Sequence, residues 1–221
     1  MFFFVSLHKN CEQSINMSEI NEYRQELKKK IVDYAMSEFF KRGVKAVKMD
    51  EISQGLHVSK RTVYEIFGDK EELLLSGMKQ QQEEMRQEIQ KYVGQGNHNV
   101  IDIVSYVYKL QMKQNEQVGS LFYEEIHRMP RVIEYLRKVH DEEHEEKARF
   151  FDAGVKEGLF RSDINFELML EIAHVATQEI MHRQIYNSYP MQQVFDNWFL
   201  VIIRGFCTER GLKLLNEAIE G

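Results

Sequence analysis

Proline is nearly absent from this sequence, with two residues in 221. Because proline interrupts helices, and because Glu, Gln, Lys, Leu and Met are abundant, the composition favours long helices. No alternation of apolar and polar residues is long enough to require a sheet. We therefore predict an all-α fold for a chain whose 43% hydrophobic and 29% charged residues are typical of a soluble globular protein.

Cysteine is equally scarce, and its two positions, Cys11 and Cys207, lie near opposite ends of the chain. This spacing excludes a disulfide framework and a multi-cysteine metal site, and it is typical of a protein in the reducing cytoplasm. Residues 1–7 are apolar but too short to span a bilayer, and no basic region precedes them as in a signal peptide. We expect residues 1–20 to be a disordered leader, as would follow from a translation start at Met17, and we expect no membrane partner.

An excess of positive charge is also missing, since the formal net charge is −6. That value alone argues against a nucleic-acid binder, but the charge is unevenly distributed. Residues 21–70 carry eleven Lys and Arg against eight Asp and Glu, a balance of +3, whereas residues 71–221 have a balance of −8. A basic head on an acidic body is typical of a protein that presents one end to a polyanion, although a split of this size can also arise by chance.

Residues 48–67 contain two short amphipathic segments around a tight turn. If residues 50–56 and 60–67 are helical, the apolar side chains share one face. These are Ile52, Leu56, Val58, Val63 and Phe67. The opposite face of the second segment then carries Lys60, Arg61, Thr62 and Tyr64, and Ser59 is placed to cap its N-terminus. The pattern predicts a helix-turn-helix, with an ordinary helical hairpin of basic exposed face as the alternative.

The helix-turn-helix is followed by a helix start. Asp69 and Glu72 have the spacing of a capping box, so Lys70 is expected to be the first residue of this helix. A helix N-terminus and a lysine both attract a DNA phosphate.

Residues 31–74 resemble the DNA-binding domain of TetR-family transcriptional regulators. The most specific part is the pattern V-S-K-R-T-V-Y-x-x-F-x-x-K-x-x-L over residues 58–73. The resemblance implies that Tyr64 and Lys70 bind the DNA backbone, while the first turn of the second helix faces the groove. The resulting DNA-binding prediction is Lys48, Ser59, Lys60, Arg61, Thr62, Tyr64 and Lys70.

The sequence departs from the family pattern at two places. His57 stands where the turn often has glycine, although histidine tolerates a positive φ better than a β-branched residue does. Val47 and Lys48 stand where threonine or serine often opens the first helix of the motif. Lys48 can supply the phosphate contact as a point charge instead.

The expected organisation is a three-helix DNA-binding head over residues 21–70 and a helical ligand-binding and dimerisation domain over residues 71–221. The head is expected to begin with a helix over residues 23–42, in which Leu27, Ile31, Ala35 and Phe39 form an apolar stripe and Gly43 is the C-cap. The helices of the body are expected at 71–93, 99–114, 118–127, 131–157, 163–186 and 191–209, with Gly158 closing the fourth. The last of these is apolar on nearly all sides and must be buried on more than one face. The resemblance implies a homodimer in which the last two helices of each subunit form a four-helix interface. The predicted interface residues are Ile172, Ala176, Phe195, Phe199, Ile202 and Phe206.

The resemblance also implies a pocket in the body for a small-molecule effector. Aromatic and polar side chains of the body are candidates, with plain core packing as the alternative. They are Tyr106, Tyr108, Phe122, Tyr123, His127, Phe150, Phe151, His174 and Gln178. The aromatic content suggests an apolar or planar effector.

No cofactor or metal is expected. His140 and His144 share a helix face as zinc ligands can, but Asp141 stands where the zinc-protease motif requires glutamate. A charged, solvated face is therefore the favoured interpretation of this segment.

These features predict a DNA-binding transcriptional regulator, a repressor rather than an enzyme, whose operator affinity is changed by an effector. Two other classes stay open. One is a metal-dependent hydrolase that uses the histidines and carboxylates of the body, and the other is a helical interaction protein with neither ligand nor operator.

Overall fold

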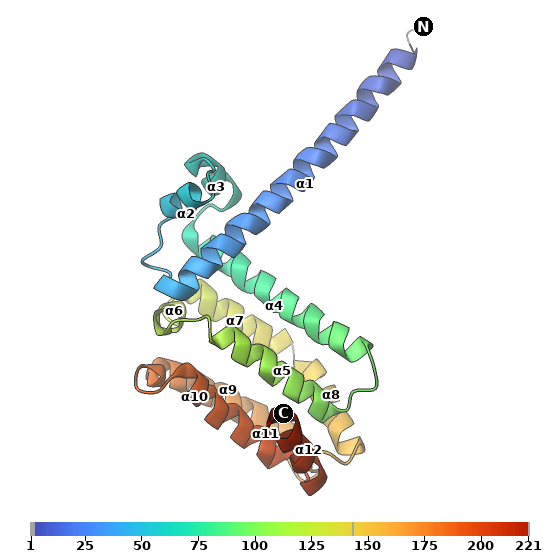
Figure 1. Ribbon diagram of the computed structural model, residues 1–221, viewed down its shortest axis with the longest axis vertical. Helices are drawn as coiled ribbons and strands as arrows, with labels where there is room; N and C mark the ends of the chain where they lie inside the picture. The colour runs from blue at the N-terminus through green and yellow to red at the C-terminus, as the bar shows by residue number, and fades with distance from the viewer. Residues whose placement is uncertain (1–2, 143, 221) are drawn as a thin grey trace.

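The computed structural model describes the backbone of residues 3–142 and 144–220, and the side chains of residues 22–139 and 147–219. The regular elements of these residues are helices (Figure 1), so the predicted all-α fold is confirmed. The head consists of α1 (Phe3–Arg42), α2 (Met49–Gly55) and α3 (Lys60–Ile66), followed by α4 (Lys70–Gly94). In Figure 1, α2 and α3 lie beside α1, and α4 leads from the head to the body.

The body begins with α5 (Val100–Asn115) and α6 (Ser120–Ile126). It continues with α7 (Pro130–Glu142), α8 (His144–Lys156) and α9 (Phe166–His182). The helix expected over residues 131–157 is thus found as α7 and α8, on either side of residue 143. Proline is well placed as the first residue of α7, because the backbone N–H that it lacks is unpaired in the first turn of any helix.

The last part of the body is a nearly continuous run of helix. A 3-10 turn (Ile185–Asn187) precedes α10 (Met191–Phe195), a π-helical turn (Asp196–Leu200) and α11 (Val201–Phe206). The chain then forms α12 (Glu209–Glu220), which the sequence analysis did not anticipate. This helix packs on α5 and buries Leu215 in the same apolar cluster as Phe206.

Residues 3–20, expected to be a disordered leader, are instead described as the first part of α1. Neither proline nor glycine occurs before Gly43, so this stretch contains no helix-breaking residue. The other end of α1 is as predicted. Gly43 follows the last helical residue with φ +79°, and its N–H donates to the carbonyl of Phe39 at 2.9 Å.

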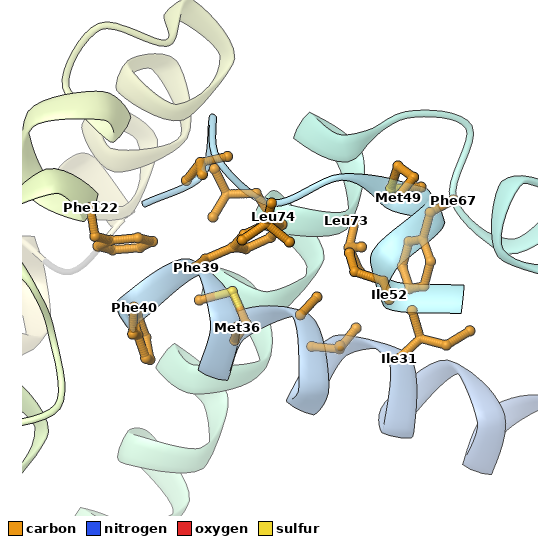
Figure 2. Close-up of a cluster of buried hydrophobic side chains, with 14 of the residues drawn as sticks. Ile31, Met36, Phe39, Phe40, Met49, Ile52, Phe67, Leu73, Leu74 and Phe122 are labelled. Carbon is orange, nitrogen blue, oxygen red and sulfur yellow. The ribbon is translucent and has the colours of Figure 1, made fainter. Parts of the chain in front are cut away.

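The head is built around one apolar cluster, drawn in Figure 2. The predicted stripe of α1 is buried there, with Ile31 and Phe39 at 0% exposure, and α2 and α3 contribute Ile52 and Val63, also at 0%. Phe122 enters from α6 at the opposite end of the cluster from Phe67 (Figure 2). The core of the head therefore continues into the body without a gap.

The turn between α2 and α3 requires a positive φ at His57, where the family pattern often has glycine. His57 has φ +55°, a left-handed conformation that glycine adopts without steric cost. Its side chain is exposed, so packing does not compensate for the strain. The histidine is therefore accommodated at a cost in stability.

We predict that His57→Gly raises the free energy of unfolding by about 0.5–1 kcal/mol, because the positive φ no longer meets a Cβ. Urea unfolding followed by circular dichroism measures this difference. Gln54→Gly is the matched control, since it places glycine at an exposed helical position of α2 and should lower stability by a similar amount. A loss of stability in both variants would contradict the assignment of strain to His57.

Candidate nucleic-acid interface

The start of α3 has the cap that its sequence predicts. Ser59 Oγ accepts a hydrogen bond from the backbone N–H of Thr62 at 3.0 Å, and the two side-chain oxygens are 2.7 Å apart. Ser59 itself is extended, with φ −69° and ψ 143°. Because this cap fixes where α3 begins, it also fixes which side chains leave its first turn.

The outer face of α3 carries two paired cations. The Lys60 ammonium lies 2.8 Å from an Asp50 carboxylate oxygen and 5.8 Å from the ring centroid of Tyr64. Arg61, whose side chain is 87% exposed, lies 2.6 Å from a carboxylate oxygen of Glu65. Exposed pairs of this kind contribute about 0–1 kcal/mol, so a DNA phosphate can replace either carboxylate at little cost.

The remaining predicted contacts differ in position. Tyr64 is 42% exposed on the same helix as Lys60 and Arg61. Lys48 is exposed at the N-cap of α2 and makes no side-chain cap there, as expected from the missing hydroxyl. The structure thus places Ser59, Lys60, Arg61 and Tyr64 on the accessible side of α3 and Lys48 at the start of the neighbouring helix.

Lys70 does not point outward, which corrects the interpretation of this residue as a simple phosphate ligand. Its Nζ donates to the carbonyls of Val44 at 2.6 Å, Val47 at 2.8 Å and Lys45 at 3.2 Å. An ammonium has three N–H donors, so all of them are already used. Burial lowers the pKa of Lys70, while nearby carboxylates, Glu125 foremost, oppose this shift. The lysine therefore ties the start of α4 to the segment between α1 and α2.

The cap of α4 is close to the predicted capping box. The Asp69 carboxylate accepts from the N–H of Glu72 at 2.7 Å. The return bond is displaced by one residue, since the Glu72 carboxylate accepts from the N–H of Gly68 at 3.1 Å.

The predicted effector residues fall into several separate clusters. Phe122 is buried in the head cluster, where its ring meets Phe40 edge-on at 4.8 Å. Tyr123 lies on α6 and His127 is the C-cap of that helix, with Nδ1 of His127 2.8 Å from the carbonyl of Tyr123. Burial raises the pKa of Tyr123 to about 12 and lowers that of His127.

The other candidates are equally dispersed. Tyr108 donates to Asp196 at 2.7 Å and stacks on Phe195 and Phe199. Tyr106 stacks on Tyr92, as their ring centroids are 3.9 Å apart. A separate aromatic cluster contains Phe150, Phe151, Phe160, Phe166 and Phe206. His174 and Gln178 contact each other on α9 at 2.8 Å.

A groove of about 770 Å³ lies elsewhere, between α4 and α7 and reaching α8. We call it the α4–α7 groove and define it by Leu75, Lys79, Arg86 and Ile89 of α4 and by Arg131 and Lys138 of α7. Sequence analysis missed it. The available signal was the seven-residue spacing of its cations, which puts Lys79 and Arg86 on one face of α4 and Arg131 and Lys138 on one face of α7.

The predicted dimer residues fall into two groups. Ile172 is 49% exposed on α9, while Ala176, Phe195, Phe199 and Ile202 are half-buried. Phe206 is only 3% exposed, because its ring packs edge-on against Phe151 and Phe166 in the core of the body, so its assignment to the interface was wrong.

Among the described residues, no group of three or more His, Cys, Asp or Glu side chains is arranged to hold a metal ion. The side chains of His140 and His144 lie outside this set. The same residues include no helix long and apolar enough to cross a membrane.

Comparisons with known proteins agree with this geometry. Residues 31–76 match the model of a family described as bacterial regulatory proteins, tetR family. The TetR-family regulator from Agrobacterium tumefaciens is similar in structure, with a TM-score of 0.61 and 13% identity over 84% of this chain and 100% of that one. CprB, a TetR-family protein from S. coelicolor A3(2), is similar with a TM-score of 0.61 and 15% identity over 90% of this chain and 98% of that one. The ketosteroid transcriptional regulator KstR2 of Mycobacterium tuberculosis is similar with a TM-score of 0.53 and 18% identity over 82% of this chain and 95% of that one.

A search of curated proteins gives no match. At these identities the solved structures show the fold, whereas the family model identifies the head. The capped α3 and the core behind it define a helix-turn-helix DNA-binding protein. Residues 31–76 therefore match the tetR family of bacterial regulatory proteins, and the chain as a whole has the fold of solved TetR-family regulators.

We predict that Lys70→Met lowers the free energy of unfolding by about 1–3 kcal/mol, because three carbonyls, two of them partly buried, lose their donor. Lys45→Met, which removes an exposed lysine from the same segment, is the control and should change stability little. Urea unfolding checks both. If Lys70→Met leaves stability unchanged but weakens DNA binding, Lys70 acts as a phosphate ligand after all.

Proposed function

We propose that this regulator is an effector-responsive repressor that binds its operator as a homodimer, with residues 21–70 as the DNA-binding head and residues 71–221 as the effector and dimerisation domain. The observation that carries the proposal is the two-sided character of α3. Val63 is fully buried behind the helix, whereas Arg61 and Tyr64 remain accessible in front. A recognition helix needs this arrangement, with its N-terminal residues directed at the base edges of a major groove.

Charge supports the same orientation. The head has a balance of +3 in a chain of net charge −6, so a duplex is attracted to the head and repelled by the body. A single head offers few phosphate contacts, and two heads held about 34 Å or a multiple apart can bind successive turns of the major groove. The operator is therefore expected to be roughly palindromic.

Exposed apolar side chains on α9 and α11 provide a surface for a second copy of the chain. On α9, Leu168 is 54%, Ile172 49% and Val175 61% exposed, and their spacing places them on one face. On α11, Val201 is 62% exposed. Two copies of this apolar face can cover each other in an isologous interface, as a twofold dimer requires. This surface replaces Phe206 in the predicted interface and retains Ile172.

A gel shift and footprint with DNA from upstream of the gene, repeated at several salt concentrations, test the proposal. A regulator gives a specific footprint whose affinity falls steeply with salt. A metal-dependent hydrolase would lack the footprint and lose activity with a chelator, and an interaction protein would show neither property.

Replacing Arg61 with alanine is expected to weaken specific binding by about 1–3 kcal/mol and to relax base preference at one position, if Arg61 reads a guanine. Tyr64→Phe should weaken all sequences alike. Titration of operator and scrambled duplexes measures both effects. Arg128→Ala removes a comparable exposed arginine, paired with Glu124 one turn away on α6, and should bind as the parent does. If the Arg61 and Arg128 variants behave identically, α3 does not read the groove.

Val175→Glu should convert the dimer to monomers at micromolar concentration, because two charges would meet in an apolar interface. Analytical ultracentrifugation measures the change. Thr177→Glu adds the same charge to another face of α9 and should leave the dimer intact. A dimer that persists in Val175→Glu would place the interface elsewhere.

A further inference from the structure

The α4–α7 groove is unusual in its charge. Among the residues whose side chains the structure describes, five cations line it, namely Lys79, Arg86, Arg131, Lys138 and Lys147, against two carboxylates, Glu83 and Glu134. The body as a whole has the opposite sign, with a balance of −8 over residues 71–221. Such a local reversal concentrates small anions from solution at the groove.

Apolar side chains share the groove with these cations. Leu75, Met85 and Ile89 follow α4 at helical spacing, and Val139 faces them from α7. All four are half-buried. A volume of about 770 Å³ is within the range of sites that hold small organic ligands. The lining therefore suits a molecule with an apolar chain and an anionic head.

Contacts between α4 and α7 cross the groove. The Tyr135 hydroxyl of α7 donates to Gln82 of α4, and the Lys79 ammonium lies 5.8 Å from the Tyr135 ring centroid. A ligand entering between the two helices must rearrange these contacts. Occupation of the groove therefore changes the contacts of α4, the helix that leads to the head.

Arg131 connects the groove with the head directly. It lines the groove, and its Nη1 also lies 3.2 Å from Asp69 Oδ2 and 3.8 Å from Glu71 Oε2. Asp69 caps α4, and the next residue, Lys70, donates hydrogen bonds to backbone carbonyls within residues 44–47. Within the described part of the chain, Glu71 Oε1 is buried without a hydrogen-bond partner. The guanidinium therefore supplies charge compensation that the carboxylate of Glu71 lacks elsewhere.

We propose that the α4–α7 groove binds an amphipathic anion, an alkyl chain bearing a carboxylate or phosphate, and that this anion draws Arg131 away from Asp69 and Glu71. The inference rests on the proposed function, since it identifies the effector class and its route to the head. Loss of the Arg131 contact leaves two uncompensated carboxylates at the start of α4, beside the DNA-binding face. Operator affinity falls as a result.

Binding is tested first by isothermal titration of the full chain with decanoate, decyl phosphate, decanol and decyltrimethylammonium, each below its micelle concentration. The two anions are expected to bind, and their relative affinities distinguish a carboxylate from a phosphate head. The alcohol and the cation are expected to bind at least about tenfold more weakly, because they lack the charge-assisted hydrogen bonds. Equal binding of decanol would overturn the assignment of an anionic effector.

Regulation is tested with an operator duplex selected from a random library. The tighter-binding anion should weaken the operator complex, within the range of about 5- to 150-fold that is usual for coupled sites. Arg131→Gln should bind the operator more weakly than the parent and respond less to the anion. Arg137→Gln, an exposed arginine of the same helix outside the groove, should respond like the parent.

Asp69→Asn provides a second variant that keeps the fold, since asparagine caps a helix as well as aspartate does. It removes one of the charges that hold Arg131 and should therefore bind the anion more tightly than the parent. Anion binding without any change in operator affinity would overturn the proposed route through Arg131. A footprint with no anion binding would overturn this inference alone, whereas anion binding without any footprint would overturn the proposed function.

Discussion

Burial of one side of α3 is the constraint on which the remaining structure depends. A helix of seven residues is too short to be stable by itself in water, so α3 exists because tertiary packing holds it. Val63, at 0% exposure, and Phe67, at 1%, anchor it to α1 and α2. Once these two are buried, helical geometry leaves Arg61 and Tyr64 on the accessible side. The candidate DNA-binding face is in this sense a consequence of the core.

The same core explains how the body can influence the head. Phe122 and Ile126 of α6 and Val132 of α7 belong to the apolar cluster that supports the helix-turn-helix. Polar contacts reinforce this junction, since a Glu125 carboxylate oxygen accepts from the N–H of Lys45 at 2.7 Å. Movement of α6 or α7 is therefore transmitted to the head through packed side chains and hydrogen bonds rather than through a flexible linker.

Local patterns in the sequence predicted the head well. The Ser59 cap, the Gly43 terminus of α1 and the apolar face of α2 and α3 depend on residues within a few positions of each other, and they are confirmed. Gly158, expected to close a helix, likewise follows α8 with φ +68°. Such features are set by backbone geometry, which short sequence windows reveal.

Features that depend on distant partners were not predictable in this way. Lys70 contacts carbonyls more than twenty residues earlier in the chain, and a motif cannot show that its ammonium is already engaged. Phe206 was assigned to a dimer because the sequence does not show that Phe151 and Phe166 pack against its ring. The α4–α7 groove arises from two helices far apart in sequence, and each shows only a cation at every seventh position. The aromatic residues of the body, by contrast, were predicted to line one effector pocket, but they belong to several separate clusters.

The most direct test of the central claim is amide chemical-shift mapping of the isotopically labelled protein during titration with its operator duplex. The account predicts large changes at residues 59–64 and at Lys48, with little change on the exposed face of α9. Changes confined to the body, with α3 unaffected, would contradict it.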